Sequence, residues 1–335
     1  MKTCLFNHCR RMLVGAFSSG PIAALALLTV LALPSAAQEF PTKPIRIVVP
    51  SGPGIGTDLI ARLIAQRLNE RLGWTVLVDN KPGGNYLIGS QAVLQQPADG
   101  HTVLLAVSSM TVLPATVKDL PVNMLKDFAA VTRVATLPTV VLVTPALPAK
   151  TMPELVAYAK KNPTALSYAV TGSGSFLHLA GELLKQNLSI SMTHVPYKDT
   201  TLIADVASGR VQVAVISVAS VAQQIRAGTL RGLAILGPNR SPAIPDVPTM
   251  AELGLPEIDG EAWLGTLVRA GTPPDVIRIL NREIVAAMQT PEFKDKLPSM
   301  GAGFVQDTPE AFARLYAADI ARWQQVVQTS KLKFD

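Results

Sequence analysis

Glycine-rich turns that follow apolar runs are the residues of this chain best placed to do chemistry. The first is Ser51-Gly52-Pro53-Gly54-Ile55-Gly56-Thr57-Asp58. Its G-x-G-x-G pattern differs from the G-x-G-x-x-G spacing of dinucleotide-binding turns, and it lacks the lysine of a phosphate-binding loop, so nucleotide binding is disfavoured. The backbone N–H groups of such a turn can instead hold a carboxylate, or the turn can be structural, with Thr57 or Asp58 capping the next helix.

Two further turns and a serine pair extend this pattern. The second turn runs from Asn80 to Gly89, Ser108 and Ser109 follow another apolar run, and the third turn is Thr171-Gly172-Ser173-Gly174-Ser175. Each is a simple loop if taken alone. Because ligands bind at the carboxyl ends of strands in open α/β sheets, several such turns together favour a ligand site.

Catalytic motifs are absent from the sequence. There is no G-x-S-x-G elbow to activate a serine, and no H-E-x-x-H pair to bind zinc. After position 37 the histidines are His101, His178 and His194, far apart and without a cysteine. His178 is a catalyst or, more readily, a structural hydrogen-bonding residue, and His194 is structural. We expect no catalytic residue, metal or cofactor.

Four side chains leave alternatives open. Asp58 and Glu182 would be the candidates for an acid–base pair, but nothing in the sequence brings them together. Trp263 and Tyr197 are aromatic candidates for the wall of a cleft, with packing in the core as the alternative.

The elements that must position these residues alternate between short apolar strands and helices, which indicates an α/β fold. After Ile45–Val49, helical spacing of apolar residues predicts a helix that Gly73 ends. The remaining predicted strands are 75–79, 102–107, 140–143, 166–170, 192–195, 211–216, 230–236 and 262–268. The remaining predicted helices begin at about 151, 176, 200, 218, 274 and 308.

The N-terminus has the three parts of a secretory signal peptide, which we assign to residues 1–37. Basic residues come first, an uncharged run follows from Ile22 to Leu33, and Ser35-Ala36-Ala37 offers small residues for cleavage. The alternative, a membrane anchor, is disfavoured because a span needs about 20 apolar residues. The sequence therefore predicts a secreted protein.

Composition changes once this segment is removed. Of the 335 residues 48% are hydrophobic and 16% are charged, which excludes a disordered chain and favours two compact units. Removing three basic and no acidic residues lowers the net charge from +6 to +3, too little to imply nucleic acid as a partner. Both cysteines, Cys4 and Cys9, are also removed.

With the turns in view, the chain resembles the Bug family, the periplasmic solute-binding proteins of tripartite tricarboxylate transporters. The similarity covers essentially the whole mature chain in the right order. The matching segments include PTKPIRIVVPSGPGIGTDLIARLIAQRL, VDNKPGGN, PADGHTVLLA, DFAAVTRVA, LPAKTMPELVAYAKKNP, GSGSFLHLAGELL, THVPYK, IPDVPTMAELGLP and AGTPPDVIRILNREI.

The resemblance implies a type II-like periplasmic binding protein with two domains and two interdomain crossovers. Domain 1 would combine residues 41–140 with 263–335, and domain 2 would comprise 141–262. The family closes around a small carboxylate, held by N–H groups and ordered waters. Carried over to this sequence, the residues that would bind the ligand are Ser51, Gly54, Ile55, Gly56, Thr57, Asp58, Gly84, Asn85, Tyr86, Ser108, Ser109, Ser173, Ser175, His178, Tyr197 and Ser217.

Departures from the family pattern bear on the solute. Ser51 stands where relatives usually have an aromatic residue, Ile55 where they have glycine, and Tyr86-Leu87 interrupts the glycine run of the second turn. Ser217, after Ile216, stands where many relatives carry an acid that could pair with an amino group. An amino acid is thus disfavoured, and a carboxylic acid with an aromatic or hydrophobic middle is favoured. Asp199 replaces a common glycine.

The implied function is capture of a small carboxylate, such as a di- or tricarboxylic or aromatic acid, by hinge closure of a monomer, and its delivery to the subunits of a membrane transporter. One alternative is a binding protein that feeds a sensor kinase. Another, less favoured, is a secreted enzyme on the same scaffold, suggested by His178 beside the third turn.

Overall fold

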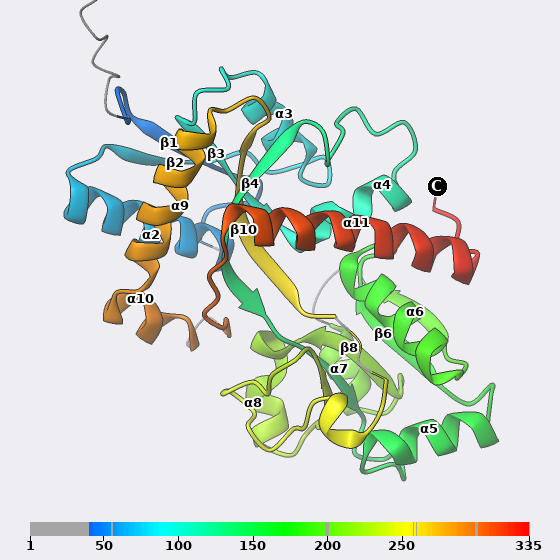
Figure 1. The fold of residues 1–335 in the computed structure, drawn as a ribbon. Coiled ribbons are helices and arrows are strands. Elements are labelled where there is room, and N and C mark those ends of the chain that lie inside the picture. Colours follow the sequence, from blue (N-terminus) through cyan, green and yellow to red (C-terminus); the bar gives the residue numbers. More distant parts are fainter. Residues whose placement is uncertain are drawn as a thin grey trace, which may run out of the picture. The chain divides into compact units, whose positions relative to one another are not determined.

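The computed structural model describes residues 40–54, 56–197, 201–256, 258, 260–298 and 301–334. These residues form two five-stranded sheets with helices around them (Figure 1). The expected signal peptide, Ile55 and Asp199 lie outside the described residues.

The first sheet has the strand order β2-β1-β3-β10-β4. β1 pairs in parallel with β2 on one side and β3 on the other, and β10 joins β3 to β4 in antiparallel fashion. The strands are β1 Ile45–Val49, β2 Val76–Asn80, β3 Thr102–Val107, β4 Phe128–Leu137 and β10 Ala262–Arg269.

The second sheet repeats this arrangement in the order β7-β6-β8-β5-β9. β6 pairs in parallel with β7 and β8, and β5 pairs in antiparallel fashion with β8 and β9. Its strands are β5 Thr139–Val143, β6 Ser167–Thr171, β7 Thr193–Tyr197, β8 Val213–Ser217 and β9 Arg231–Leu236. The chain therefore crosses from the first sheet to the second after β4 and returns before β10.

Helices connect the strands and cover the sheets. Those that follow strands of the first sheet are α2 Gly56–Leu72, α3 Leu87–Leu94, the 3-10 helix η1 Ser108–Val112 and α4 Leu113–Thr116. Those associated with the second sheet are α5 Met152–Lys161, α6 Phe176–Leu188, α7 Leu202–Ala207, α8 Val218–Arg226 and the 3-10 helix η2 Ala251–Leu253. After β10 come α9 Pro274–Met288, α10 Pro291–Lys296 and α11 Pro309–Ser330.

Local sequence explains the limits of several helices. Gly73 adopts φ 65° after α2, a left-handed conformation that glycine adopts without strain. Thr151, Ser175 and Thr308 cap α5, α6 and α11, each accepting a hydrogen bond from the N–H group three residues later. The helix starts predicted at 151, 176 and 308 are thereby confirmed.

The predicted strands are confirmed to within two residues, and β1 and β3 have the predicted limits. β4, α3, α4 and α10 are elements that the sequence analysis did not predict. The helix predicted to begin at about 200 is α7, which begins at Leu202 in the structure. The residue limits of the two expected domains stay a prediction.

Helix α11 contacts elements associated with the first sheet and an element associated with the second. It packs against β4, η1 and α4 on one side and against α6 on the other (Figure 1). Trp323 and Val326 of α11 form a buried apolar cluster with Val112 of η1 and with Phe176 and Leu179 of α6. Within the described residues, no helix has the length and apolar character needed to cross a membrane.

Candidate functional site

Strand order locates one switch point in each sheet. From β1 the chain moves to β2 on one side and then returns past β1 to β3 on the other, so the crossover helices α2 and α3 lie on opposite faces. A crevice opens at the carboxyl ends of two such strands, and ligands bind there in open α/β sheets. The same reversal occurs from β6 to β7 and back to β8.

The predicted turns lie at these two switch points. The Ser51–Asp58 turn follows β1, and Ser108 and Ser109 follow β3. The Thr171–Ser175 turn follows β6, and Ser217 ends β8. The topology therefore brings the first two segments together at one edge of the first sheet, and the last two at one edge of the second.

The carboxylate of Asp58 holds the first turn from inside. It accepts hydrogen bonds from the Gly54 N–H at 2.8 Å, the Asn80 amide at 3.0 Å and Arg62 Nε at 2.9 Å. Only 1% of Asp58 is exposed, although the sequence analysis expected it to touch the ligand. Burial alone would raise the pKa of Asp58, but the bonds from its three partners outweigh this effect and hold the pKa below its usual value.

Several residues of the same turn remain accessible to a ligand. Ser51 Oγ lies 2.5 Å from Thr57 Oγ1, and both residues are half-buried, while Gly54 and Gly56 are exposed. The first N–H groups of α2 have no partner within the helix and carry the positive end of its dipole. Asp58 is paired with Arg62, so its charge does not oppose an anion at these N–H groups.

The second turn has four successive residues in the left-handed region, Gly83, Gly84, Asn85 and Tyr86, with φ of 114°, 56°, 50° and 73°. Such a conformation costs a residue other than glycine about 1–2 kcal/mol. Tyr86 is fixed there because its side chain packs against the hydrophobic core around the first sheet and because its carbonyl accepts a hydrogen bond of 2.9 Å from Ser90 Oγ. Gly84 and Asn85 remain exposed before α3.

The two serines after β3 differ in exposure. Ser108 is buried and its carbonyl accepts a bond from Thr111 Oγ1, whereas Ser109 is half-buried. Ser109 is therefore the more accessible of the two residues that were predicted to line the site.

The third turn is built around a cap and a histidine. Ser175 Oγ donates to the Thr171 carbonyl at 2.7 Å and accepts from the His178 N–H at 3.2 Å. His178 Nδ1 accepts a bond of 3.0 Å from the Gly174 N–H. Only Ser173 of this turn's predicted ligand residues is exposed. The histidine thus fixes the backbone of the turn that precedes its helix.

His178 is buried, with 3% exposed, in a cluster of titratable groups. Its ring stacks on His194 at 3.7 Å, and its Nε2 lies 3.9 Å from Glu182 Oε1. Tyr168 Oη, at 2.5 Å, and Lys185 Nζ, at 2.8 Å, donate to the same carboxylate oxygen. Burial and then the His194 charge lower the pKa of His178 to about 4, so its ring is neutral at physiological pH. These contacts match the structural alternative rather than a catalytic one.

The other predicted side chains also have partners within the protein. Tyr197 Oη donates to Asp205 Oδ2 at 2.7 Å, and burial and this bond raise the pKa of Tyr197. Trp263 is buried in the core and donates to Asp319 at 2.7 Å, so the core alternative is the correct one. Asp58 and Glu182, the acid–base candidates, hydrogen-bond to different sets of residues.

Sequence reasoning missed the groups that hold the first turn. Asn80, the last residue of β2, donates to both the Ser51 carbonyl and Asp58, and Arg62 donates to Asp58 and to the Asn80 side chain. The signal that could have identified Asn80 is a polar residue at the end of a strand, directly before a glycine-rich turn.

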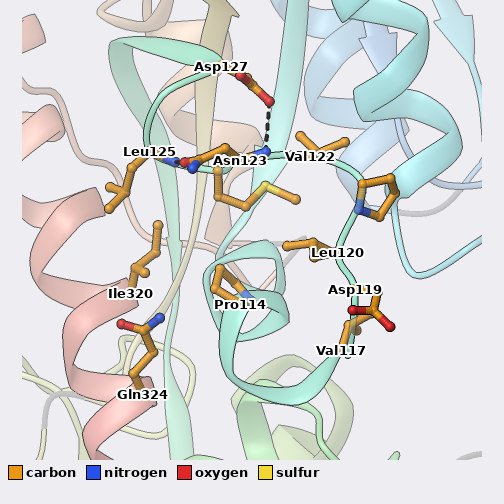
Figure 2. A pocket seen from close by; sticks show the side chains of 12 residues that line it. Pro114, Val117, Asp119, Leu120, Val122, Asn123, Leu125, Asp127, Ile320 and Gln324 are labelled. Atoms are coloured by element: carbon orange, nitrogen blue, oxygen red, sulfur yellow. Dashed lines mark hydrogen bonds between the residues drawn. The ribbon is translucent and has the colours of Figure 1, made fainter.

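Two surface pockets lie elsewhere, beside α11. The larger, of about 690 Å³, lies between α4, the 117–127 loop and α11, and Figure 2 shows Asp127 accepting a bond from the Asn123 N–H within it. The other, of about 400 Å³, is lined by parts of β4, α9 and α11. Neither is lined by a predicted ligand residue. Among the described residues, no group of three or more His, Cys, Asp or Glu side chains could hold a metal ion.

Known proteins are similar to this chain in sequence and in fold. A model described as "Tripartite tricarboxylate transporter family receptor" matches residues 60–332. Protein BugT of Bordetella pertussis is 35% identical over 306 residues, which cover 90% of this chain and 94% of BugT.

Two solved structures carry ligands in their descriptions. "R. palustris Rpa4515 with adipate" has a TM-score of 0.72 and 31% identity, covering 89% of this chain and 100% of that chain. "MatC (Rpa3494) from Rhodopseudomonas palustris with bound malate" has a TM-score of 0.68 and 28% identity, covering 86% and 100%. The expected fold class, a two-domain α/β periplasmic binding protein, is confirmed.

Proposed function

Because the chain belongs to the tripartite tricarboxylate transporter receptor family of periplasmic solute-binding proteins, we propose that it captures a small carboxylate and delivers it to a membrane transporter. The adipate and malate of two related structures support the class of solute. The protein would bind and release its solute without chemical conversion.

One observation carries this proposal. The turn at the β1/β3 switch point uses its own carboxylate, Asp58, on the inside and leaves Gly56 and Thr57 at the start of α2, a helix of 17 residues. Unpaired N–H groups at a helix N-terminus bind anions. We assign one ligand carboxylate to these N–H groups, with the Gly84–Tyr86 turn and Ser109 beside them.

The second sheet would supply the opposite side of the site. In this proposal residues 41–140 and 263–335 form one domain, residues 141–262 form the other, and Ser173, Ser175, Tyr197 and Ser217 approach the solute on closure. A hinge motion of this kind selects the closed form when solute binds. Residues 1–37 would direct the chain to the periplasm, where it would act as a monomer.

Exposed apolar side chains favour a solute with an apolar middle. Leu59, in the first turn of α2, is 41% exposed, and Ile88, in the first turn of α3, is 49% exposed. Both lie next to turns assigned to the carboxylate. Each methylene buried against such side chains contributes about 0.8 kcal/mol, so we expect adipate to bind more tightly than malate.

A panel of ligands tests the proposal. The unfolding temperature of the mature protein would be measured with adipate, malate, citrate and benzoate, and with glutamate and glucose as controls. A compound present at 100 times its Kd stabilises the folded state by about 2.7 kcal/mol, which raises Tm visibly. Stabilisation by glucose alone would refute the anion site, stabilisation by glutamate alone would refute the expectation of a solute without an amino group, and conversion of the bound acid would refute the non-enzymatic role.

A further inference from the structure

The chain after α11 folds back onto the third glycine turn. Lys331, with φ 53°, ends the helix, and the Leu332 N–H donates to the Val327 carbonyl at 3.2 Å. This reversal carries Phe334 to Gly174. A Cβ atom added to Gly174 would lie 3.2 Å from the Phe334 ring and 3.6 Å from Thr116 Cβ.

Phe334 also contacts the histidine that holds this turn. The rings of His178 and Phe334 meet edge to face, with centroids 5.9 Å apart and an interplanar angle of 88°. His178 accepts a hydrogen bond from the Gly174 N–H. Gly174 therefore donates a hydrogen bond to His178 of α6 on one side and is packed against an aromatic ring of the C-terminal segment on the other.

The position of the C-terminal segment is itself fixed by α6. Gln186 of α6 donates to the Val326 carbonyl at 3.3 Å and hydrogen-bonds to Ser330 Oγ, and Trp323 packs edge to face on Phe176 at 5.1 Å. The C-terminal half of α11 thus packs along α6 from its start at Phe176 to its last turn at Gln186, which holds Phe334 at a defined place.

We propose that Phe334 is a positioning residue of the solute site, which clamps Gly174 so that the Thr171–Ser175 turn keeps the backbone conformation that receives the solute. The inference rests on the proposed function for the role of this turn. Gly172 and Gly174, with φ of 79° and 72°, have wide conformational freedom of their own. Without the ring, the turn samples other conformations, and the apparent Kd rises in proportion to the lost competent fraction.

The experiment compares Phe334→Ala with the conservative Phe334→Leu. Two matched controls are Phe304→Ala, which removes an exposed aromatic ring far along the chain from the turn, and Lys333→Ala, which alters the same segment at an exposed position. The first measurement is amide hydrogen exchange of residues 172–178 without ligand. The second is the calorimetric Kd for adipate, malate and benzoate, well below the Tm of each variant.

For Phe334→Ala we expect exchange at residues 172–178 to be faster by about tenfold and binding to be weaker by about tenfold, as for a turn that is competent one-tenth of the time. Phe334→Leu should recover part of both, and the two controls should match the native protein.

Native exchange and native Kd in Phe334→Ala would overturn the inference, even if its Tm fell, because the ring would then only anchor the tail. If the native protein binds none of the three acids, the proposed function fails, and exchange at 172–178 alone then decides whether the clamp exists.

Discussion

The carboxylate of Asp58 accepts a hydrogen bond of 2.8 Å from the backbone N–H of Gly54, four residues before it in the chain. The bond closes the turn around a buried negative charge, which Arg62 pairs. An acidic residue within an anion-binding turn would ordinarily repel the anion. Here the acid is buried and its charge is paired with Arg62, so it fixes the loop.

Replacement of Asp58 should therefore destabilise the fold. Asp58→Ala leaves the Gly54 N–H without its acceptor and the Asn80 amide with only the Ser51 carbonyl, and hydrogen bonds to a charged group contribute about 1.5–3 kcal/mol each. We expect a loss of about 2–3 kcal/mol in the free energy of unfolding, measured by urea titration at pH 7. Glu70→Ala, which breaks an exposed ion pair with Arg67 on the same helix, should cost less than about 1 kcal/mol. Equal losses would contradict the role assigned to Asp58.

Alanine substitutions at two glycines of the same turn distinguish the cost of backbone strain from the cost of steric crowding. A Cβ at either Gly52 or Gly54 would have no described heavy atom within 4 Å, but only Gly54 has a positive φ, of 83°. Gly54→Ala should lower the free energy of unfolding by about 1–2 kcal/mol, because an L side chain is strained in this region. Gly52→Ala should be close to neutral. Urea titrations of both variants check this, and a larger loss for Gly52→Ala would show that the turn is held differently.

Sequence patterns predict most strands of this fold because short apolar runs are bounded by turn residues, as at β1 and β3. These patterns do not predict β4. Thr132 and Arg133 interrupt its apolar pattern, and its one strand partner in the sheet, β10, follows far along the chain. Thr132 accepts a bond through its carbonyl from Thr266, 134 residues later. Partners at such separation leave no local signal.

The positions of the candidate ligand turns could be predicted, but not the inward roles of two of their side chains. The family resemblance implied that Asp58 and His178 bind the ligand, whereas the residues alone left a capping role for Asp58 and favoured a structural role for His178. The direction of each side chain depends on partners from other elements, such as Asn80 for Asp58 and His194 for His178. The switch points likewise depend on strand order, which only the folded sheets reveal.

A carboxylate placed in the second turn should block an anionic solute. Gly84→Asp puts a negative charge at an exposed turn residue with φ 56°, a conformation that aspartate tolerates better than most residues. Like charges about 4 Å apart repel by several kcal/mol at a protein surface, so we expect binding of the stabilising acid to weaken by about a hundredfold or more. Gly228→Asp is the matched control, since Gly228 is exposed with φ 73° after α8. Calorimetry that finds native affinity in Gly84→Asp would place the anion elsewhere.

The buried histidine of the third turn should make stability depend on pH. The pKa of His178 is lowered to about 4 by burial and by His194, with Lys185 acting in the same direction and Glu182 opposing. The unfolded chain, with an ordinary histidine pKa near 6.5, therefore binds more protons than the folded protein between about pH 6.5 and 4. The stabilisation by neutral His178 is complete above that window and is lost as pH falls through it.

From these two pKa values, His178 alone should make the native protein about 2 kcal/mol less stable at pH 5 than at pH 7. His194, whose pKa is also lowered by burial, adds to this loss. His178→Gln keeps an oxygen that can accept from the Gly174 N–H but does not titrate, so the difference between the two pH values should shrink by about that amount. Urea titrations at pH 7 and pH 5 measure it. Phe304→Ala, which retains every histidine, should keep the native difference. If His178→Gln also kept it, folding would not lower the pKa of His178, and the ring would be protonated at pH 5 in the folded protein, where it could not accept the bond from the Gly174 N–H.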